Sequence, residues 1–484
     1  MAFSFNRVLS HFAPDLALSR EVNKAKFDIL HRRRAMANAS YPVVSGPRSK
    51  EFRRNNLDAN SAARGAREPL AFIGREMLRN NPRVVRAVAL IANHTTQGGV
   101  RPVVVMKDKE NKKGRDRVQG LIDDHLLTTA VDADGRVDLF GLQRLSMMTI
   151  PTSGEVLLRR RLRRKGDGLP LPFQIQMLEG DFLSSERDGV RDGVEIADGI
   201  EFSRAGQRLA YHLYSNHPGG AYGGGNVRRV EEEHIAHSYL MTRPGQMRGV
   251  SWLVPVMAEL QMVHKFMQAT LDRQSVAAMF AGVIKRGGDE DDEGGKFDDQ
   301  MNELVSGSIF EIDSRDELEF TNPPDAESAP VVINLVDRVI AGALGLSFES
   351  FTASYRGVNY TGGRMGRMDN DPTIKSFQQQ LIINQQMSRV SEWFKDAVYM
   401  QAFIEPTDYK ITWTAPERPV VDPTKDFAAM KVEREIGLNS RRGQLRQMGR
   451  DAEGVEREIQ EEDARERASD QRFKNSTVDD TSDK

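Results

Sequence analysis

The segment from Arg243 to Arg286 has the clearest periodicity in the chain. After Pro255, apolar residues recur at steps of three and four, which places them on one face of a helix. These residues are Val256, Leu260, Val263, Met267 and Leu271. Gly282 ends the pattern, and the following Val283-Ile284 favours an extended chain. We expect a long amphipathic helix over residues 255–281 that packs side by side with copies of itself, although a core helix of a globular domain has the same pattern.

Similar patterns predict helices and strands along most of the chain. Helices are expected at 68–78, 82–97, 118–129, 139–150, 331–344 and 373–404. Strands are expected at 100–106, 155–164, 171–178, 199–202, 209–214, 308–312 and 317–320. This mixture predicts the α+β class.

Two segments depart from these patterns. Residues 354–368 are rich in Gly, Arg and Asn and lack periodicity. Past Arg450 the chain is charged and poor in aromatic residues, so we expect a disordered tail there.

The composition narrows the function classes. A length of 484 residues allows about two to four domains. The 68 Lys and Arg residues nearly balance the 70 Asp and Glu residues, which argues against a protein that grips nucleic acid over its whole surface. The absence of cysteine excludes disulfides, thiolate zinc sites and a cysteine nucleophile. Because no apolar run suits a membrane span or a signal peptide, we expect no membrane association and synthesis in the cytosol.

Motifs for enzymatic chemistry are incomplete. Gly294-Gly295-Lys296 is followed by Phe297, whereas a phosphate-binding P-loop needs Ser or Thr there. His234 and His237 could share a metal ion, but the sequence fixes no third ligand. The acidic run 289–293 lacks the spacing of a calcium-binding EF-hand. We therefore expect no catalytic residues, no metal site and no cofactor.

Short segments spread from about residue 67 to residue 462 carry a resemblance. They are Met77-Leu78-Arg79-Asn80-Asn81-Pro82, Ser153-Gly154-Glu155-Val156, Gly199-Ile200-Glu201-Phe202, Ala210-Tyr211-His212, Arg243-Pro244-Gly245-Gln246, Arg248-Gly249-Val250-Ser251-Trp252-Leu253, Ile340-Ala341-Gly342-Ala343-Leu344-Gly345-Leu346, Val358-Asn359-Tyr360 with Gly363-Arg364, Asp422-Pro423-Thr424-Lys425 and Gly437-Leu438-Asn439-Ser440. Each is weak alone. In this order and spacing, the chain resembles the lambda-type family of bacteriophage portal proteins.

The resemblance implies a homo-oligomeric ring, typically a dodecamer, at one vertex of the capsid. Double-stranded DNA enters and leaves through the ring without sequence-specific recognition. The implied partners are the terminase, the major capsid or scaffold protein and the head-completion proteins. The implied location is the virion, after assembly in the host cytoplasm.

The family's domains are called wing, stem, clip and crown, and the resemblance assigns them to this chain by analogy. The expected regions are an N-terminal arm (1–60), a wing (61–253), a stem helix (254–282), a clip (283–329), a second stem helix (330–346), a tunnel-loop region (347–372), a wing and crown helical region (373–450) and a charged tail (451–484).

Basic residues in two of these regions are the candidate DNA contacts. The expected channel residues are Arg356, Asn359, Arg364 and Arg367 near the tunnel loop, and Lys285 and Arg286 at the junction of stem and clip. The first group could instead form ion pairs between subunits or face solvent, and the second could be a solvated turn. The densest basic run is Arg159, Arg160, Arg161, Arg163 and Arg164, which we expect on an exposed or interfacial strand.

Other functions stay open at this point. A packaging ATPase or nuclease subunit conflicts with the missing P-loop. A minor capsid or scaffold component would share the near-neutral charge, although scaffolds are mostly helical and this chain has many expected strands. A portal of a defective prophage or of a gene-transfer particle would have the same sequence features.

Overall fold

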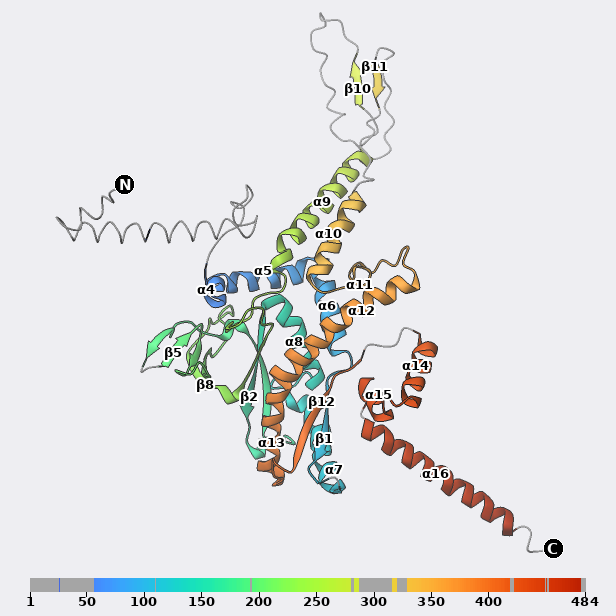
Figure 1. Cartoon of the computed structure of the whole chain (residues 1–484). Coiled ribbons are helices and arrows are strands. Elements are labelled where there is room, and N and C mark those ends of the chain that lie inside the picture. Colours follow the sequence, from blue (N-terminus) through green and yellow to red (C-terminus); the bar gives the residue numbers. More distant parts are fainter. Residues whose placement is uncertain are drawn as a thin grey trace, which may run out of the picture. The chain divides into compact units, whose positions relative to one another are not determined.

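The computed structural model mixes helices and sheets, which confirms the α+β prediction (Figure 1). It describes residues 26, 56–108, 110–191, 194–279, 283–286, 316–319, 329–417, 422–448, 450 and 452–479. The chain divides into two compact units, Met1–Ala62 and Ala63–Lys484, and α4 (Ala59–Ala63) crosses this boundary. All other elements below belong to the second unit. The expected strand 308–312, the acidic run 289–293 and most of the N-terminal arm lie outside the described residues.

Three helices form one side of the main core. They are α5 (Arg67–Asn80), α6 (Pro82–Thr96) and α8 (Leu139–Ser153), and they pack against one another. The Asn81 side chain accepts a hydrogen bond from the Arg83 backbone N–H at 3.0 Å and so caps the start of α6. At Gly74, a Cβ atom would lie 2.2 Å from the Thr152 carbonyl oxygen, so α5 and α8 approach closely only because glycine stands there.

A three-stranded antiparallel sheet has the order β3-β2-β9, with β2 (Glu155–Leu162) in the centre between β3 (Phe173–Glu179) and β9 (Ile235–Tyr239). Side chains alternate across β2. Val156 and Leu158 belong to the main core, whereas Leu157 belongs to a second, smaller core. The first half of β2 is therefore buried on both faces, whereas its basic second half is only partly buried.

The smaller core lies under a five-stranded antiparallel sheet. Its strands are β4 (Gly189–Arg191), β5 (Val194–Ala197), β6 (Ile200–Phe202), β7 (Arg208–Tyr214) and β8 (Val227–Glu231), in that order. Tyr211 and Leu213 of β7 meet Leu157 and Leu178 of the other sheet there.

A long helical stretch covers the main core from the C-terminal half. It begins as α12 (Tyr360–Phe377), widens to a π-helical segment (Gln378–Met387) and continues as α13 (Ser388–Ala402). The apolar residues of the helix predicted at 373–404 are buried: Phe377, Leu381, Met387, Val390, Phe394 and Val398. The strands β1 (Arg101–Met106) and β12 (Tyr409–Thr414) pair antiparallel across this large sequence separation.

Two further helices pack side by side, α9 (Met257–Met279) and α10 (Ala329–Ala343) (Figure 1). They confirm the helices expected at 255–281 and 331–344 within the described residues. The strands β10 (Val283–Arg286) and β11 (Asp316–Glu319) pair antiparallel. None of the described helices combines the length and apolar character that crossing a membrane requires.

Three predictions from sequence need correction. Residues 354–368 lack periodicity because α12 buries few apolar side chains, yet they are helical from Tyr360 onward. The tail predicted to be disordered contains α16 (Ala452–Asp479), which an ion pair between Glu456 and Arg442 links to α15 (Arg441–Gln447). The helix expected at 118–129 begins earlier, as α7 (Lys112–Leu121), and ends in a π-helical turn (Ile122–Leu126).

Candidate nucleic-acid interface

The four candidate residues from the expected tunnel-loop region lie at or near the start of α12. The Asn359 side chain caps this helix by accepting a hydrogen bond from the Gly362 N–H at 2.7 Å, so its role in the described structure is local. Arg356 lies in the preceding turn and is exposed. Arg364 and Arg367 lie on α12 itself. One helix thus brings the two latter arginines together, one turn apart.

Both arginines of α12 face acids of the same chain. Arg364 lies 3.5 Å from Asp426 of α14 (Pro423–Glu435), and Arg367 lies 3.7 Å from Asp371. A cavity of about 290 Å³ joins these pairs to Lys375. Its charges are mixed, so it would attract a phosphate backbone weakly.

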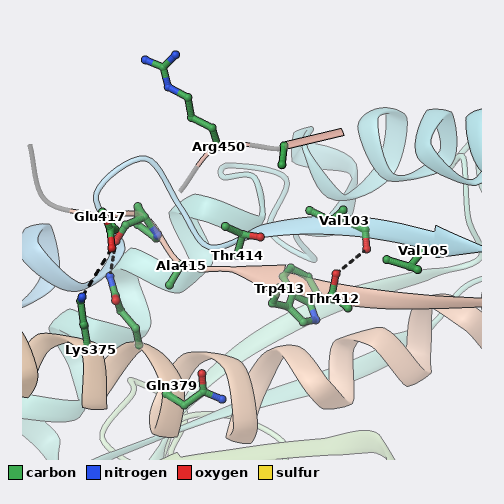
Figure 2. A pocket seen from close by; sticks show the side chains of 13 residues that line it. Val103, Val105, Lys375, Gln379, Thr412, Trp413, Thr414, Ala415, Glu417 and Arg450 are labelled. Carbon is green, nitrogen blue, oxygen red and sulfur yellow. Dashed lines mark hydrogen bonds and ion pairs between the residues drawn. The ribbon is translucent and has the colours of Figure 1, made fainter. Parts of the chain in front are cut away.

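A larger cavity of about 620 Å³ adjoins it, between the β1–β12 strand pair and the helical stretch (Figure 2). At one end Lys375 pairs with Glu417 at 3.6 Å. The Gln378 amide donates to the Pro416 carbonyl oxygen at 2.9 Å. Burial raises the pKa of Glu417, Lys375 opposes this rise, and Asp371 adds to it.

Lys285 and Arg286 end strand β10, where the sequence allowed a solvated turn. In the ladder with β11, Lys285 lies opposite Glu317 and Arg286 lies opposite Asp316.

Two of the segments that carry the family resemblance, 153–156 and 248–253, meet in a buried polar cluster. We call it the Glu155 cluster and define it as Glu155, His237 and Arg248. One carboxylate oxygen of Glu155 accepts from the Arg248 guanidinium at 2.9 Å. The other accepts from His237 Nε2 at 2.9 Å and from the Gly249 N–H at 3.0 Å. Arg248 also donates to the Gly180 carbonyl oxygen at 2.8 Å.

The cluster fixes the protonation states of its members. Burial disfavours the charged form of Glu155, but Arg248 and His237 outweigh it and hold the pKa of this carboxyl below its usual range. Burial lowers the pKa of His237 to about 4, against the opposing effect of Glu155. His237 is thus neutral near pH 7, and the ion pair is between Glu155 and Arg248.

Two glycines let the chain close over this cluster. A Cβ atom at Gly249 would lie 2.0 Å from the Gly154 carbonyl oxygen, and one at Gly154 would lie 2.6 Å from Val250. A second pair of family-like segments meets similarly, because Glu201 accepts from His212 at 2.8 Å and from Arg229 at 2.9 Å. These segments therefore contribute to the fold through paired polar groups of the same chain.

The described residues hold one group with metal-ligand geometry, Glu179, Asp181 and His217. Arg75 donates to both oxygens of Asp181, at 2.7 and 2.9 Å, and lies 3.3 Å from Glu179. A guanidinium therefore already supplies the positive charge there. The sequence candidates His234 and His237 have separate partners, since His234 Nδ1 accepts from Arg160 at 3.0 Å.

An ion pair that the sequence did not suggest connects α6 with α10. The Arg83 guanidinium donates to both carboxylate oxygens of Asp337, at 2.6 and 3.1 Å. Asp337 is buried in a largely apolar helix whose polar residues are Asn334, Asp337 and Arg338, and the sequence alone does not distinguish Asp337 from the other two.

Comparisons with known proteins agree with the resemblance. The sequence profile described as "Phage portal protein, lambda family" matches residues 45–378. The probable portal protein of Halomonas phage phiHAP-1 is 26% identical over 358 residues, which cover 68% of this chain and 67% of the relative.

Solved structures with a similar chain include the neck of an empty GTA particle computed with C6 symmetry (14% identity, TM-score 0.48, 78% of this chain and 94% of that chain). Another is an HK97 family phage portal protein from Corynebacterium diphtheriae (10% identity, TM-score 0.33, 74% and 97%). Because the family profile spans well over half of the sequence, the chain belongs to the lambda family of phage portal proteins.

Proposed function

We propose that copies of this portal protein assemble side by side into a ring whose central channel passes double-stranded DNA into and out of the capsid. The observation that carries this proposal is the apolar surface that α9 and α10 leave uncovered within one subunit. A helix that is apolar on most sides requires burial on most sides.

On α10, the inward face is satisfied, because Asp337, Ile340 and Ala341 are buried. The outward face carries Val331, Leu335 and Val339, which are 69, 64 and 55% exposed. These three residues recur at steps of four and therefore form one stripe.

On α9, Met262 and Leu271 are each 60% exposed. We call the exposed residues Val331, Leu335 and Val339 of α10 the apolar stripe. Met262 and Leu271 lie on opposite faces of α9 and add exposed apolar surface to the helix pair. A second copy of the same chain is the partner that a portal subunit always has beside it in a ring, and such a contact would remove this surface from water.

The domain assignment stays a proposal that fits this arrangement. The paired helices α9 and α10 would be the stem, and the β10–β11 hairpin between them would belong to the clip. Residues 61–253 would form the wing, and α12 would lie where the tunnel-loop region was expected. The long helical stretch that follows would return to wing and crown.

Arg356, Arg364 and Arg367 remain our proposed channel contacts, with Asn359 as the cap that sets their helix and Lys285 and Arg286 as further candidates. Acidic neighbours of Arg364 and Arg367 support a surface that guides DNA without holding it, because each uncompensated cation would add salt-dependent affinity. Terminase, capsid or scaffold protein and head-completion proteins are the proposed partners in the host cytoplasm and the virion.

The ring proposal is tested with Leu335→Glu, which places a charge in the apolar stripe. Native mass spectrometry and negative-stain microscopy are applied to the full-length protein coexpressed with its capsid and scaffold proteins. We expect rings with a central channel from the wild type and dispersed subunits from the variant, with an unchanged melting temperature of the subunit.

The matched control is Leu438→Glu, which introduces the same charge at a residue that is 77% exposed outside α9 and α10. It should form rings like the wild type. Rings of normal number and stoichiometry from Leu335→Glu would overturn the assignment of the stripe to the subunit contact.

A further inference from the structure

The arginine side chains of the dense basic run on β2 lie on two faces of the strand, and the two faces have different neighbours. Successive side chains of a strand point to opposite faces. Arg160 points to one face, where it donates to Asp396 at 2.7 Å and to His234 at 3.0 Å. Arg159 and Arg161 point to the other face, where no acid of the described chain meets them.

On that second face, Arg159 and Arg161 line a hollow of about 290 Å³ together with Arg228 of β8. We call this the arginine hollow. Within the described residues, no hydrogen bond or ion pair joins any of the three guanidinium groups to another side chain. Arg159 and Arg161 are half-buried and Arg228 is exposed, whereas buried or half-buried arginines elsewhere in the described residues, such as Arg67, Arg75 and Arg83, pair with an acid.

The electrostatics of the arginine hollow favour an anion. Burial lowers the pKa of Arg159, and repulsion from Arg161 and Arg228 lowers it further. An oxyanion between them would relieve this repulsion and would occupy several guanidinium N–H donors, whose planar fork matches phosphate geometry.

The lining favours a phosphate backbone over an acidic peptide. Ser215 and Asn216 at the hollow are exposed and polar. The apolar lining residues Leu178 and Leu213 are only 4 and 1% exposed, because the smaller core already uses them. Phe182 and Tyr214 also line the hollow and are half-buried, so an aromatic contact is available there. The lining offers three guanidinium groups as donors and contains no carboxylate, and the planar fork of a guanidinium matches phosphate geometry.

We propose that the arginine hollow of Arg159, Arg161 and Arg228 binds phosphate groups of the DNA backbone. This is a second DNA contact, formed by the two sheets, and it does not include the arginines of α12. It holds DNA without reading its sequence, because nothing in the hollow is arranged to reach base edges.

The test compares the triple variant Arg159→Gln/Arg161→Gln/Arg228→Gln with the wild type, as full-length protein. The probe is covalently closed circular plasmid, which cannot thread through an assembled ring. Filter binding is measured between about 50 and 200 mM salt. A plot of the logarithm of the binding constant against the logarithm of the salt concentration has a negative slope, and each phosphate contact contributes about 0.9 to its magnitude. We therefore expect this magnitude to be smaller by about 2 to 3 in the variant.

The charge-matched control is Arg136→Gln/Arg187→Gln/Arg204→Gln, which removes three exposed arginines elsewhere. It should keep the wild-type slope. If the triple variant fails to fold, the single variant Arg228→Gln on the edge strand β8 is used, and it should reduce the magnitude of the salt slope by about 1. Microscopy of the same preparations separates this result from the ring proposal, because ring formation should be equal in all variants.

Two outcomes would overturn the proposal. One is a plasmid slope in the triple and single variants equal to that of the control. The other is unchanged plasmid binding together with lost binding of a polyglutamate probe, which would assign the hollow to an acidic protein segment.

Discussion

The Glu155 cluster and the helix pair α9–α10 solve the problem of burial in opposite ways. In the cluster, Glu155 and Arg248 are charged and almost fully removed from water, and each is satisfied by partners of the same chain. In the helix pair, apolar side chains such as Val331 and Leu335 remain exposed.

The difference separates what one subunit completes alone from what it leaves to a neighbour. Polar groups tolerate burial only when they are paired, so the cluster must be complete as soon as the subunit folds. Apolar groups tolerate exposure until a partner arrives, and an incomplete apolar surface is therefore a practical site for assembly.

The largest expected effect comes from breaking the cluster. Glu155→Gln keeps the size of the side chain but removes its charge, which leaves Arg248 buried without a counter-ion. We expect a loss of about 3 to 5 kcal/mol in the free energy of unfolding. Urea unfolding measured by circular dichroism checks this, with exposed Glu195→Gln as the control. A loss below about 1 kcal/mol would place the pair among surface-like ion pairs.

The ion pair that joins the helix pair to the main core is the next target. Asp337→Asn removes the carboxylate that accepts two hydrogen bonds from Arg83 and so joins α10 to α6. A charge-assisted pair of this kind should cost about 2 to 3 kcal/mol when it is broken. We expect faster proteolysis within α10 and fewer rings. Asp369→Asn on exposed α12 is the control, and equal protease resistance of the two variants would show that the link is dispensable.

His125 is an exception within the subunit's own core and makes the comparison sharper. It is fully buried against Phe173, with ring centroids 4.8 Å apart, and it hydrogen-bonds to no other side chain of the described residues. Burial lowers its pKa from 6.5 to about 4, so the fold favours the neutral ring. Its contribution to stability is present above pH 6.5 and is lost as the pH falls toward 4.

Between about pH 7.5 and pH 5 the unfolded chain takes up a proton at His125 that the folded chain does not. Linkage therefore predicts that this residue lowers the free energy of unfolding by about 2 kcal/mol over this range. Unfolding free energies at these two pH values should differ less in His125→Leu than in the wild type. If both proteins lose stability equally over this range, other groups would account for the acid sensitivity.

Periodicity predicted the parts of the fold that have one buried face. The helices α6, α9, α10 and α13 carry apolar stripes, and the cap at Asn81 is a local signal that needs no tertiary context. Periodicity does not indicate the helix over 360–372, the first part of α12, or the tail helix α16, because exposed and paired residues dominate both.

The sites depend on contacts that spacing cannot reveal. Glu155 and Arg248 lie 93 positions apart in the sequence, and the three members of the arginine hollow come from two sheets. The sequence marked the basic run on β2, but only the geometry shows that Arg160 is paired while Arg159 and Arg161 are not. The channel residues were proposed from the family resemblance, and they stay a prediction.

The pairing of β1 with β12 has a consequence for synthesis on the ribosome. Thr412 of β12 meets Val103 of β1 across 309 positions of sequence. At a translation rate of about 5 to 20 residues per second, the ribosome needs about 15 to 60 seconds to make that intervening length. During this delay the apolar strand around Val103 is already outside the ribosome and has no native strand partner. Nascent portal chains are therefore clients for chaperones during this interval, and slow translation of the second half of the message would lengthen the exposure.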